Sequence, residues 1–214
     1  MIISPGRRYI FVHIPKTAGT ALALALETRT RADDILLGDT PKARRRRHRL
    51  KGVTAAGRLW KHSTLADIDG LVSAPQLAEY FCFTLVRNPW DRMVSYYHWL
   101  RVQAFDHPAV ILAKTLDFSA FLNHPQTRAS VTAWPYGRYM CDAVGVERCK
   151  SFIRIEHFEQ EAAPLWSHLG FRLALDRVNH SDRCADYRGY FSDNDAALLA
   201  ELCAEDITRF GYTF

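Results

Sequence analysis

The sequence predicts an α/β fold, a three-layer sandwich in which helices flank a mostly parallel central sheet. An apolar run at residues 9–14 is followed by a turn and by an Ala- and Leu-rich helical segment at 21–29, which together form half of a strand–helix–strand unit. A second run, 80–86, is apolar at nearly every position, as expected for a parallel strand covered on both faces. A third run at 151–155 precedes a helical stretch at 157–169. This recurrence of strand and helix is the pattern of a mostly parallel sheet.

The helix after the second strand has a well-defined start. Asn88 suits the N-cap, Pro89 the first helical position and Asp91 the third, and the helix is expected to run to about Val102. A short helix is also expected at 65–72, capped by Ser63 or Thr64 with Asp67 three residues beyond Thr64.

The rest of the chain gives weaker signals. Residues 104–145 are typical of short helices and loops, and 179–190 of a polar loop. Ser192 is expected to cap a last helix from about Asp193 to Arg209, which Gly211 ends. Residues 30–60 are polar and basic and give no clear assignment.

Length and composition favour one soluble globular domain. The 214 residues are 48% hydrophobic and 24% charged, and we expect a single domain over residues 1–214 with insertions at about 30–60 and 103–145. No apolar stretch approaches the roughly 18–20 residues that span a bilayer. The apolar start is broken too early to be a signal peptide, and the five cysteines form no C-x-x-C pair, so we expect reduced thiols and a cytoplasmic protein.

The positive charge is concentrated in one segment. Residues 42–51 contain seven Lys or Arg and no acid, and removing these seven charges from the net +5 leaves −2 for the rest of the chain. The segment is either a solvated surface or a patch that attracts an anionic ligand, acceptor or surface. No recognised nucleic-acid-binding motif accompanies it, so no specific nucleic-acid partner is expected.

A donor-rich turn joins the first strand to the first helix. A helix N-terminus offers unpaired backbone N–H groups and a partial positive charge, so it binds anions. Glycine lets the backbone approach a ligand, hydroxyls add donors, and a lysine adds a full charge. The candidate anion-binding residues are Pro15, Lys16, Thr17, Ala18, Gly19 and Thr20. The alternative is a plain strand–helix connection with an exposed lysine.

This turn differs from the phosphate loop of ATPases and GTPases. That loop reads G-x-x-x-x-G-K-[ST], whereas here Lys16 precedes Gly19 and the first glycine is missing. No apolar strand ends in an aspartate that would hold magnesium. The turn is therefore suited to a phosphate, but in a different way.

A second candidate anion site follows the central strand. Arg87 lies at the carboxyl end of that strand, where open α/β sheets bind ligands, and Ser95 lies about two turns into the next helix. A guanidinium fork and a hydroxyl suit phosphate oxygens. Two such sites predict a ligand with two separated phosphates. The alternative is a structural ion pair between Arg87 and Asp91.

Together the two segments resemble the sulfotransferase superfamily. FVHIPKTAGT at 11–20 resembles its 5′-phosphosulfate loop, and LVRNPWDRMVSY at 85–96 resembles its 3′-phosphate segment. The versions found here are most similar to the branch of bacterial sulfotransferases and heparan sulfate 2-O-sulfotransferases. Weaker likenesses to that branch occur at Lys61-His62-Ser63-Thr64, at Asn179-His180-Ser181, at Tyr187-Arg188 and at 206–214.

The resemblance implies a P-loop-like fold and a specific donor. That donor is 3′-phosphoadenosine 5′-phosphosulfate (PAPS), which leaves adenosine 3′,5′-bisphosphate (PAP) as product, and no metal is expected. The loop 15–20 would bind the phosphosulfate, with Lys16 as a catalytic residue, while Arg87 and Ser95 would hold the 3′-phosphate. Tyr187 and Arg188 would lie near the nucleotide, although the Arg-Lys-Gly pattern of that loop is missing.

The expected reaction is in-line sulfuryl transfer to a hydroxyl or amine of a small-molecule or glycan acceptor, by expectation a carbohydrate. Among nine histidines, His62 is the candidate base because it lies in the family-like segment, whereas His13 is expected to pack or to orient the loop. The acceptor could contact the basic segment or aromatic side chains, which otherwise belong to the core. The alternatives are a kinase-like nucleotide enzyme and a polyanion-binding protein with a vestigial nucleotide site. The sequence leaves the oligomeric state open.

Overall fold

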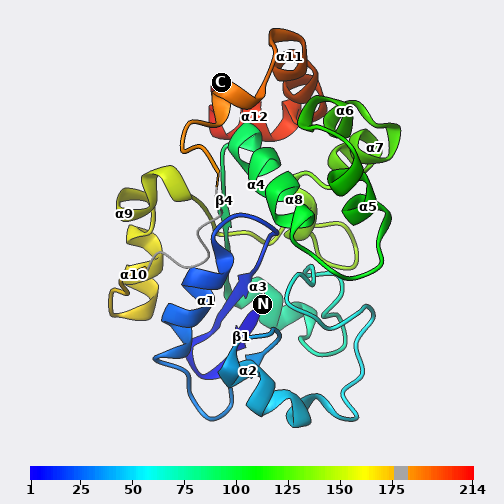
Figure 1. The fold of residues 1–214 in the computed structure, drawn as a ribbon. Helices are drawn as coiled ribbons and strands as arrows, with labels where there is room; N and C mark the ends of the chain where they lie inside the picture. Colours follow the sequence, from blue (N-terminus) through cyan, green and yellow to red (C-terminus); the bar gives the residue numbers. More distant parts are fainter. Residues whose placement is uncertain (176–182) are drawn as a thin grey trace. The chain divides into compact units, whose positions relative to one another are not determined.

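A computed structural model of the protein describes residues 1–175 and 183–214 (Figure 1). They form two compact units. The first unit contains Met1–Val86 and residues 136–175, and the second contains Arg87–Pro135 and residues 183–214. Each unit is described by itself. The polar loop expected at 179–190 is described only from residue 183, so the family-like Asn179-His180-Ser181 lies outside the described residues.

The first unit contains a five-stranded sheet of order β3-β1-β2-β4-β5. β2 pairs in parallel with β4, and β4 with β5, whereas β1 pairs antiparallel with both β2 and β3. Four strands therefore point the same way and only β1 is reversed, which confirms the predicted α/β fold with a mostly parallel sheet. The strands are β1 (Ile2–Ser4), β2 (Tyr9–Val12), β3 (Ile35–Leu36), β4 (Phe81–Val86) and β5 (Ser151–Arg154).

β1 and β3, which the antiparallel pairings of β1 join to the sheet, were not predicted from the sequence. They contain three and two residues, too few for an alternation of polar and apolar residues to be recognised. The 3₁₀ turn η1 (Pro5–Arg7) reverses the chain between β1 and β2, and Arg8 takes a left-handed conformation with φ 53°. This tight turn brings Ile2 opposite Phe11.

One face of the sheet is covered by helices that follow the strands. α1 (Gly19–Glu27), α2 (Pro41–Arg46), α9 (Phe158–Glu161) and α10 (Ala163–Leu169) contribute to this layer (Figure 1). Phe11 and Phe83 from neighbouring strands stack beneath it, with ring centroids 5.3 Å apart. The helices contribute buried apolar residues to the same cluster, namely Leu22, Ala23, Leu26, Ala43, Phe158, Ala162, Leu165 and Trp166.

The opposite face takes the alternate residues of the strands. Cys82 faces α3 (Ala74–Glu79), where its thiol contacts the carbonyl of Leu77 at 3.8 Å. The loop before α3 joins the short helix α8 (Tyr136–Tyr139) through the amide of Leu65, which donates to the carbonyl of Tyr139 at 3.0 Å. Buried side chains therefore cover both faces of β2 and β4, as their apolar sequences require.

The helix expected at 65–72 is wrong. Its capping chemistry is present, because the Asp67 carboxylate accepts from the amide of Thr64 at 2.7 Å. However, the carbonyls of Asp67 and Asp69 accept from the amides of Gly57 and Ala56 at 3.0 and 2.9 Å. These bonds to an adjacent loop replace the i to i+4 bonds of a helix, so the segment forms successive turns.

Two predicted helices are each divided in two. The stretch 157–169 consists of α9 and α10, which meet at Ala162, and Pro164 has no N–H to continue the ladder of the first helix. The stretch 193–209 consists of α11 (Asp193–Leu202) and α12 (Ala204–Phe210), which meet at Cys203 with φ −112° and ψ 21°. Gly211 ends the last helix at φ 66°, as predicted.

The second unit is helical within its described residues. Its elements are α4 (Pro89–Arg101), α5 (Pro108–Thr115), α6 (Phe118–Asn123), α7 (Pro125–Ala133), η4 (Tyr187–Tyr190), α11 and α12. The short helices expected within 104–145 are thereby confirmed. Aromatic rings join α4, α6 and η4: Tyr97 and Phe118 are 5.4 Å apart, and Phe118 and Tyr190 are 5.9 Å apart.

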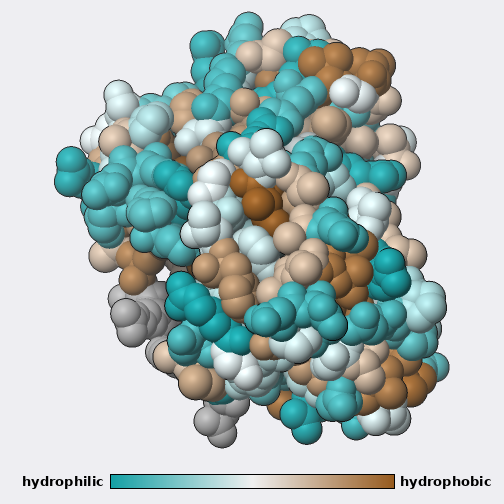
Figure 2. All heavy atoms as spheres, turned by 90° about the horizontal axis from the view of Figure 1, so that it is seen from above, coloured by the Kyte–Doolittle hydropathy of each residue, from teal (hydrophilic) through white to brown (hydrophobic). Residues whose placement is uncertain are grey.

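No helix in residues 1–175 and 183–214 is both long and apolar enough to cross a membrane. On the face drawn in Figure 2, hydrophobic residues form small separate groups among polar ones.

Asn88 is the N-cap of α4 and also ties this helix to the rest of the second unit. Its side-chain oxygen accepts from the amides of Trp90 and Asp91 at 3.0 and 3.4 Å. Its amide nitrogen donates to the Tyr187 hydroxyl at 3.2 Å and to the Thr213 carbonyl at 3.0 Å. Asn88 is 8% exposed, so these bonds are largely shielded from water.

We expect Asn88→Ala to lower the free energy of unfolding by about 1–2 kcal/mol, because it removes the cap and leaves buried partners unsatisfied. Asn88→Ser is the matched control, since its hydroxyl keeps an uncharged capping oxygen and only the bonds donated by the amide nitrogen are lost. It should therefore cost less than Asn88→Ala in urea denaturation. Equal losses for the two variants would show that the cap contributes nothing.

Candidate functional site

The predicted site residues fall in both units. In the first unit, the chain leaves β2 at Val12 and enters α1 at Gly19. Lys16 and Ala18 take left-handed conformations, with φ 67° and 58°, and Ala18 is the N-cap of α1. Left-handed residues alternating with others orient successive amides toward one side, and the first amides of a helix have no partner within it. The loop 15–20 thus has a backbone geometry compatible with the predicted anion binding.

Thr17 fixes the shape of this turn. Its side chain is completely buried, and its hydroxyl donates to the carbonyl of Ile14 at 2.9 Å. The hydroxyl was expected to face an anion, but its proton is engaged inside the loop. Thr17 can therefore offer a ligand its backbone amide, while Thr20, in the first turn of α1 and half-buried, keeps the role of hydroxyl donor.

Gly19 is required by its contact with His13. A Cβ at this position would overlap the imidazole ring of His13. That ring lies on the residue just after β2, stacks on Phe11 at 6.0 Å and is only 6% exposed. The glycine therefore allows the start of α1 to pack directly on the histidine.

His62 lies in contact with His13. Its Nδ1 lies 2.7 Å from the carbonyl oxygen of His13, and its ring meets the His13 ring edge-on at 4.7 Å. A carbonyl oxygen only accepts, so Nδ1 is the nitrogen that bears the proton. In the neutral ring the lone pair is then on Nε2, which is the nitrogen available to act as a base. The ring of Trp60, which is 40% exposed, packs edge-on to His62 at 5.0 Å.

Burial lowers the pKa of His13 well below 6.5, and the electrostatic effects of the neighbouring His62, the N-terminal amino group, Lys61 and Lys16 lower it further. His13 is therefore neutral at neutral pH.

Lys61, next to His62, belongs to a charge network with the basic segment. Asp39 pairs with Lys61 at 3.1 Å and with Arg47 at 3.6 Å. Burial acts to raise the pKa of Asp39, but the hydrogen bond from Lys61 and the charges of Lys61, Arg44 and Arg47 outweigh it, so this pKa is lowered.

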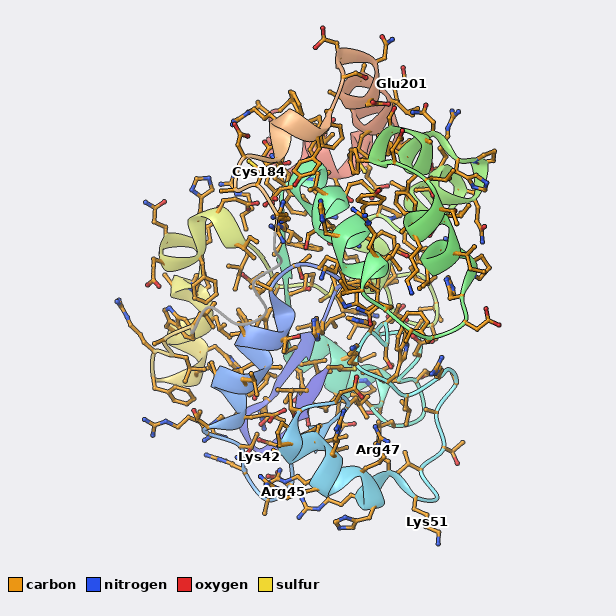
Figure 3. All side chains as sticks on the ribbon, viewed as in Figure 1. Lys42, Arg45, Arg47, Lys51, Cys184 and Glu201 are labelled. Carbon is orange, nitrogen blue, oxygen red and sulfur yellow. The ribbon has the colours of Figure 1, made fainter. Side chains whose placement is uncertain are left out.

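The basic segment 42–51 folds as α2 followed by the 3₁₀ helix η2 (Arg47–Leu50). Several of its charged side chains make hydrogen bonds to backbone carbonyls. Lys42 donates to the carbonyl of Glu27, Arg46 to that of Arg31 at 2.9 Å, and Arg49 to that of Ala32 at 2.5 Å. Figure 3 labels Lys42, Arg45, Arg47 and Lys51 along this segment. Lys42, Arg46 and Arg49 keep their charge, but their contacts fix the segment against the end of α1 and the chain that follows it.

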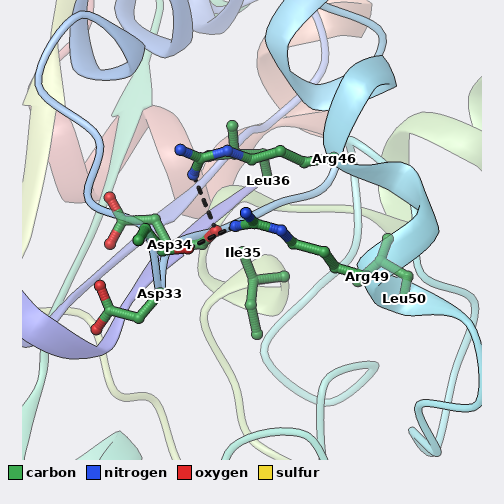
Figure 4. A pocket seen from close by; sticks show the side chains of 8 residues that line it. Asp33, Asp34, Ile35, Leu36, Arg46, Arg49 and Leu50 are labelled. Atoms are coloured by element: carbon green, nitrogen blue, oxygen red, sulfur yellow. Dashed lines mark hydrogen bonds between the residues drawn. The ribbon is translucent and has the colours of Figure 1, made fainter.

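A hollow of about 260 Å³ lies where these arginines cross the chain (Figure 4). Residues 32–36 form one wall, and Arg46, Arg49 and Leu50 form the other. Arg46 donates to the carbonyl of Asp34 across it at 3.3 Å. The arginines thus tie the segment after α1 to η2, and none of the predicted site residues lines the hollow.

In the second unit, Arg87 contacts Asp91 through two nitrogens, with Nε 2.7 Å and a terminal nitrogen 2.6 Å from the same carboxylate oxygen. Arg183 contacts the other oxygen at 2.6 Å. The ion pair between Arg87 and Asp91, which was the alternative to an anion site, is therefore present. Two guanidinium groups share this one carboxylate, so the three side chains together keep one positive charge. Ser95, 6% exposed, lies one turn beyond Asp91 on the same side of α4.

Arg183 was missed because a lone arginine in a polar loop has no local signal. Tyr187 and Arg188, the two other predicted site residues of this polar loop, differ in their burial and contacts. Tyr187 accepts from Asn88 at the start of α4, and burial raises its pKa. Arg188 is exposed, pairs with Asp186 at 3.4 Å and lies over the Tyr187 ring at 5.3 Å. The second unit therefore places Arg87, Arg183 and Tyr187 around the start of α4, with Arg188 at the surface.

Within residues 1–175 and 183–214, no three His, Cys, Asp or Glu side chains are grouped so that they could hold a metal ion.

A turn with two left-handed residues follows β2, and an arginine directly follows the neighbouring parallel strand β4, in an α/β fold of the kind that binds ligands at the carboxyl ends of its strands. The model of the Sulfotransferase family matches residues 1–212, and the chain belongs to that family. It is a sulfotransferase by family, which favours sulfuryl transfer over the kinase-like alternative.

A crystal structure of mouse sulfotransferase SULT7A1 complexed with PAP has a similar fold. The TM-score is 0.56 at 19% sequence identity, and the match covers 96% of this chain and 85% of the mouse chain. A comparison with curated protein sequences finds no significant match.

The buried neutral His13 predicts acid-sensitive stability. Below pH 6.5 the unfolded chain gains a proton at His13 and the folded chain does not, so the free energy of unfolding should fall as pH falls, by at most about 1.4 kcal/mol per pH unit. Urea denaturation between pH 7.5 and 5.5 measures the slope, which His13→Phe should reduce. His157→Ala, at an exposed histidine, is the control. A slope unchanged in His13→Phe would contradict the assignment.

Proposed function

We propose that the protein transfers a sulfuryl group from PAPS to a hydroxyl or amine of an acceptor. The observation that carries the proposal lies in the first unit: an anion-binding turn and a histidine with a basic Nε2 are held together through His13. Family membership gives the reaction class. PAP in the mouse sulfotransferase crystal supports PAPS as donor, because PAP is what PAPS becomes after transfer.

In this proposal the donor binds through two anion sites. The amides of the loop 15–20 and Lys16 hold the 5′-phosphosulfate, and Arg87 and Ser95 hold the 3′-phosphate. Arg183 adds to the second site, since it shares Asp91 with Arg87. β2 and β4 are parallel neighbours in register from Tyr9 and Phe81 to Val12 and Thr84, so both strands end at the same edge of the sheet. Family membership supports one donor for the two segments.

The transfer step needs a proton acceptor and stabilisation of the leaving group. The acceptor oxygen attacks sulfur and gives its proton to Nε2 of His62. The bond between sulfur and the bridging phosphate oxygen breaks, and PAP leaves with the electron pair. Negative charge builds on that phosphate oxygen, where Lys16 and the loop amides stabilise it.

The finer assignments belong to the same proposal. We place the protein in the branch of bacterial sulfotransferases and heparan sulfate 2-O-sulfotransferases, with a cytoplasmic location and a carbohydrate acceptor. The exposed Trp60 beside His62 supports the acceptor class, because an indole face can stack on a sugar ring. The other aromatic residues considered for acceptor contact are Tyr96, Tyr97, Trp99, Trp134 and Tyr136. Of these, Tyr97 and Tyr136 are buried, which favours a core role for both.

Donor recognition can be tested before any acceptor is known. We expect calorimetry without magnesium to show binding of PAP well above that of adenosine 5′-monophosphate, adenosine 5′-diphosphate and ATP. Arg87→Ala should lower PAP affinity by roughly 10–100-fold, as for loss of a charged hydrogen bond, and leave the 5′-monophosphate almost unaffected. Arg101→Ala is the control, because Arg101 ends α4 and is exposed.

Equal loss for both nucleotides in Arg87→Ala would point to a folding role for Arg87. Preference for ATP with magnesium would overturn the proposed reaction in favour of kinase-like chemistry. Absence of nucleotide binding would favour the polyanion-binding alternative.

Lys16 should act on the chemical step rather than on donor binding. We expect Lys16→Ala to lower turnover by about 10²–10³-fold, the scale for losing one group that stabilises transition-state charge, with a much smaller change in PAP affinity. Transfer of radiolabelled sulfate to an acceptor found by screening gives turnover. Lys114→Ala, an exposed lysine of α5, should behave like the unmodified protein. Unchanged turnover in Lys16→Ala would remove Lys16 from the mechanism.

A further inference from the structure

His13 contacts both the start of α1 at Gly19 and the candidate base His62, and the transfer step proposed above uses neither its ring nor its carbonyl. We propose that His13 is a positioning residue: it holds His62 in the orientation and tautomer of a base, and it links that orientation to the start of α1 at Gly19. The inference rests on the proposed function for the role of His62, but the contacts themselves are independent of it.

The carbonyl of His13 selects the tautomer. It lies 2.7 Å from Nδ1 of His62, a short distance for a neutral hydrogen bond, and it can only accept. If His62 carried its proton on Nε2, two lone pairs would face each other at this distance. The bond therefore keeps the lone pair on Nε2 and fixes the plane of the ring.

The ring of His13 fills the space between His62 and the helix. It meets the His62 ring at 4.7 Å with an interplanar angle of 70°, and Phe11 supports it from the strand. On its other side it contacts Gly19 so closely that no Cβ fits there. A displacement of either neighbour must therefore move this ring, because it is buried and closely packed.

The charge state of His13 agrees with its role as a positioning residue. His13 is neutral at neutral pH, whereas Lys16 and Lys61 on either side are cations that disfavour a further positive charge. When His62 takes a proton, a neutral neighbour adds no repulsion. A cationic residue at position 13 would oppose that protonation, so a neutral ring suits the position.

The contacts predict an indirect effect of Gly19. A methyl group at Gly19 must push the His13 ring, and through it the His62 ring, out of place. Removal of the His13 ring also removes the three nearest atoms that this methyl group would meet. The consequences of Gly19→Ala should therefore depend on which residue occupies position 13, as in a double-mutant cycle between contacting residues.

The test combines spectroscopy with kinetics. Long-range ¹H–¹⁵N NMR spectra should show His62 with its proton on Nδ1 in the unmodified protein, and a mixture of tautomers in His13→Ala and in Gly19→Ala. Each single variant should lose about 10²-fold in kcat/KM, the scale for a misplaced catalytic group, and shift the acidic limb of the pH profile. The double variant should lose no more than the worse single variant.

Further variants and a binding measurement keep the outcomes distinct. His13→Phe retains an aromatic wedge and should preserve the Nδ1-protonated tautomer, and His13→Leu replaces His13→Ala if the latter does not fold. His62→Ala gives the activity without the base, and His157→Ala controls for loss of an exposed histidine. Calorimetry with PAP shows whether Gly19→Ala acts on donor binding instead.

An Nδ1-protonated His62 in every variant would overturn the inference, and so would losses for Gly19→Ala and His13→Ala that multiply in the double variant. If the tautomer changes as expected but no variant transfers sulfate, the positioning contact stands and the proposed function fails. The spectra need no acceptor, so the two failures can be distinguished.

Discussion

The parallel pairing of β2 with β4 is the constraint on which the first unit depends. Its register joins Tyr9 to Phe81 and Val12 to Thr84, and the buried hydroxyl of Thr84 donates to the carbonyl of Val12 at 2.8 Å near the ends of the strands. Phe11 and Phe83 stack on one face of the same pair. A one-residue shift in register would turn the side chains of one strand to the opposite face and break both contacts, so the edge at which β2 and β4 end is firmly set.

Charge in the second unit is balanced in a way that suits an anion. Arg87 and Arg183 approach the two oxygens of the Asp91 carboxylate, both at 2.6 Å, and all three side chains are largely buried. The carboxylate orients both guanidinium groups and neutralises one of their charges, which lowers the cost of holding two cations together. One positive charge is left, on groups whose geometry is already fixed before a ligand arrives. A structural ion pair and an anion site are therefore compatible at Arg87.

Most of the architecture could be predicted because the strongest local signals coincide with the buried elements. The apolar run before Arg87 and the Asn88-Pro89 cap gave β4 and α4, whose ends agree with the prediction within about a residue. The errors lie where nonlocal bonds decide the structure. The amide of Gly57 donates to the Asp67 carbonyl, which a helix at 65–72 would need as an acceptor for its own hydrogen bonds. β1 and β3 form only because neighbouring strands pair with them. At the site, Lys16 and Arg87 were recognisable from motifs, whereas the contact of Gly19 with His13 and the pairing of Arg183 with Asp91 join residues that no local pattern connects.

The backbone of the loop 15–20 shows how the first unit maintains a strained conformation. Lys16 and Ala18 are both left-handed, and neither is glycine, so each costs roughly 1 kcal/mol or more relative to an ordinary conformation. Glycine would remove this cost, but it would also widen the set of conformations the unliganded loop adopts. The buried Thr17 between them holds the turn through its bond to Ile14, and the following glycine packs on His13. The loop is thereby held in one shape by its own contacts. In the proposed function its amides and the His62 lone pair are arranged before the donor binds, so that binding need not supply the free energy to order them.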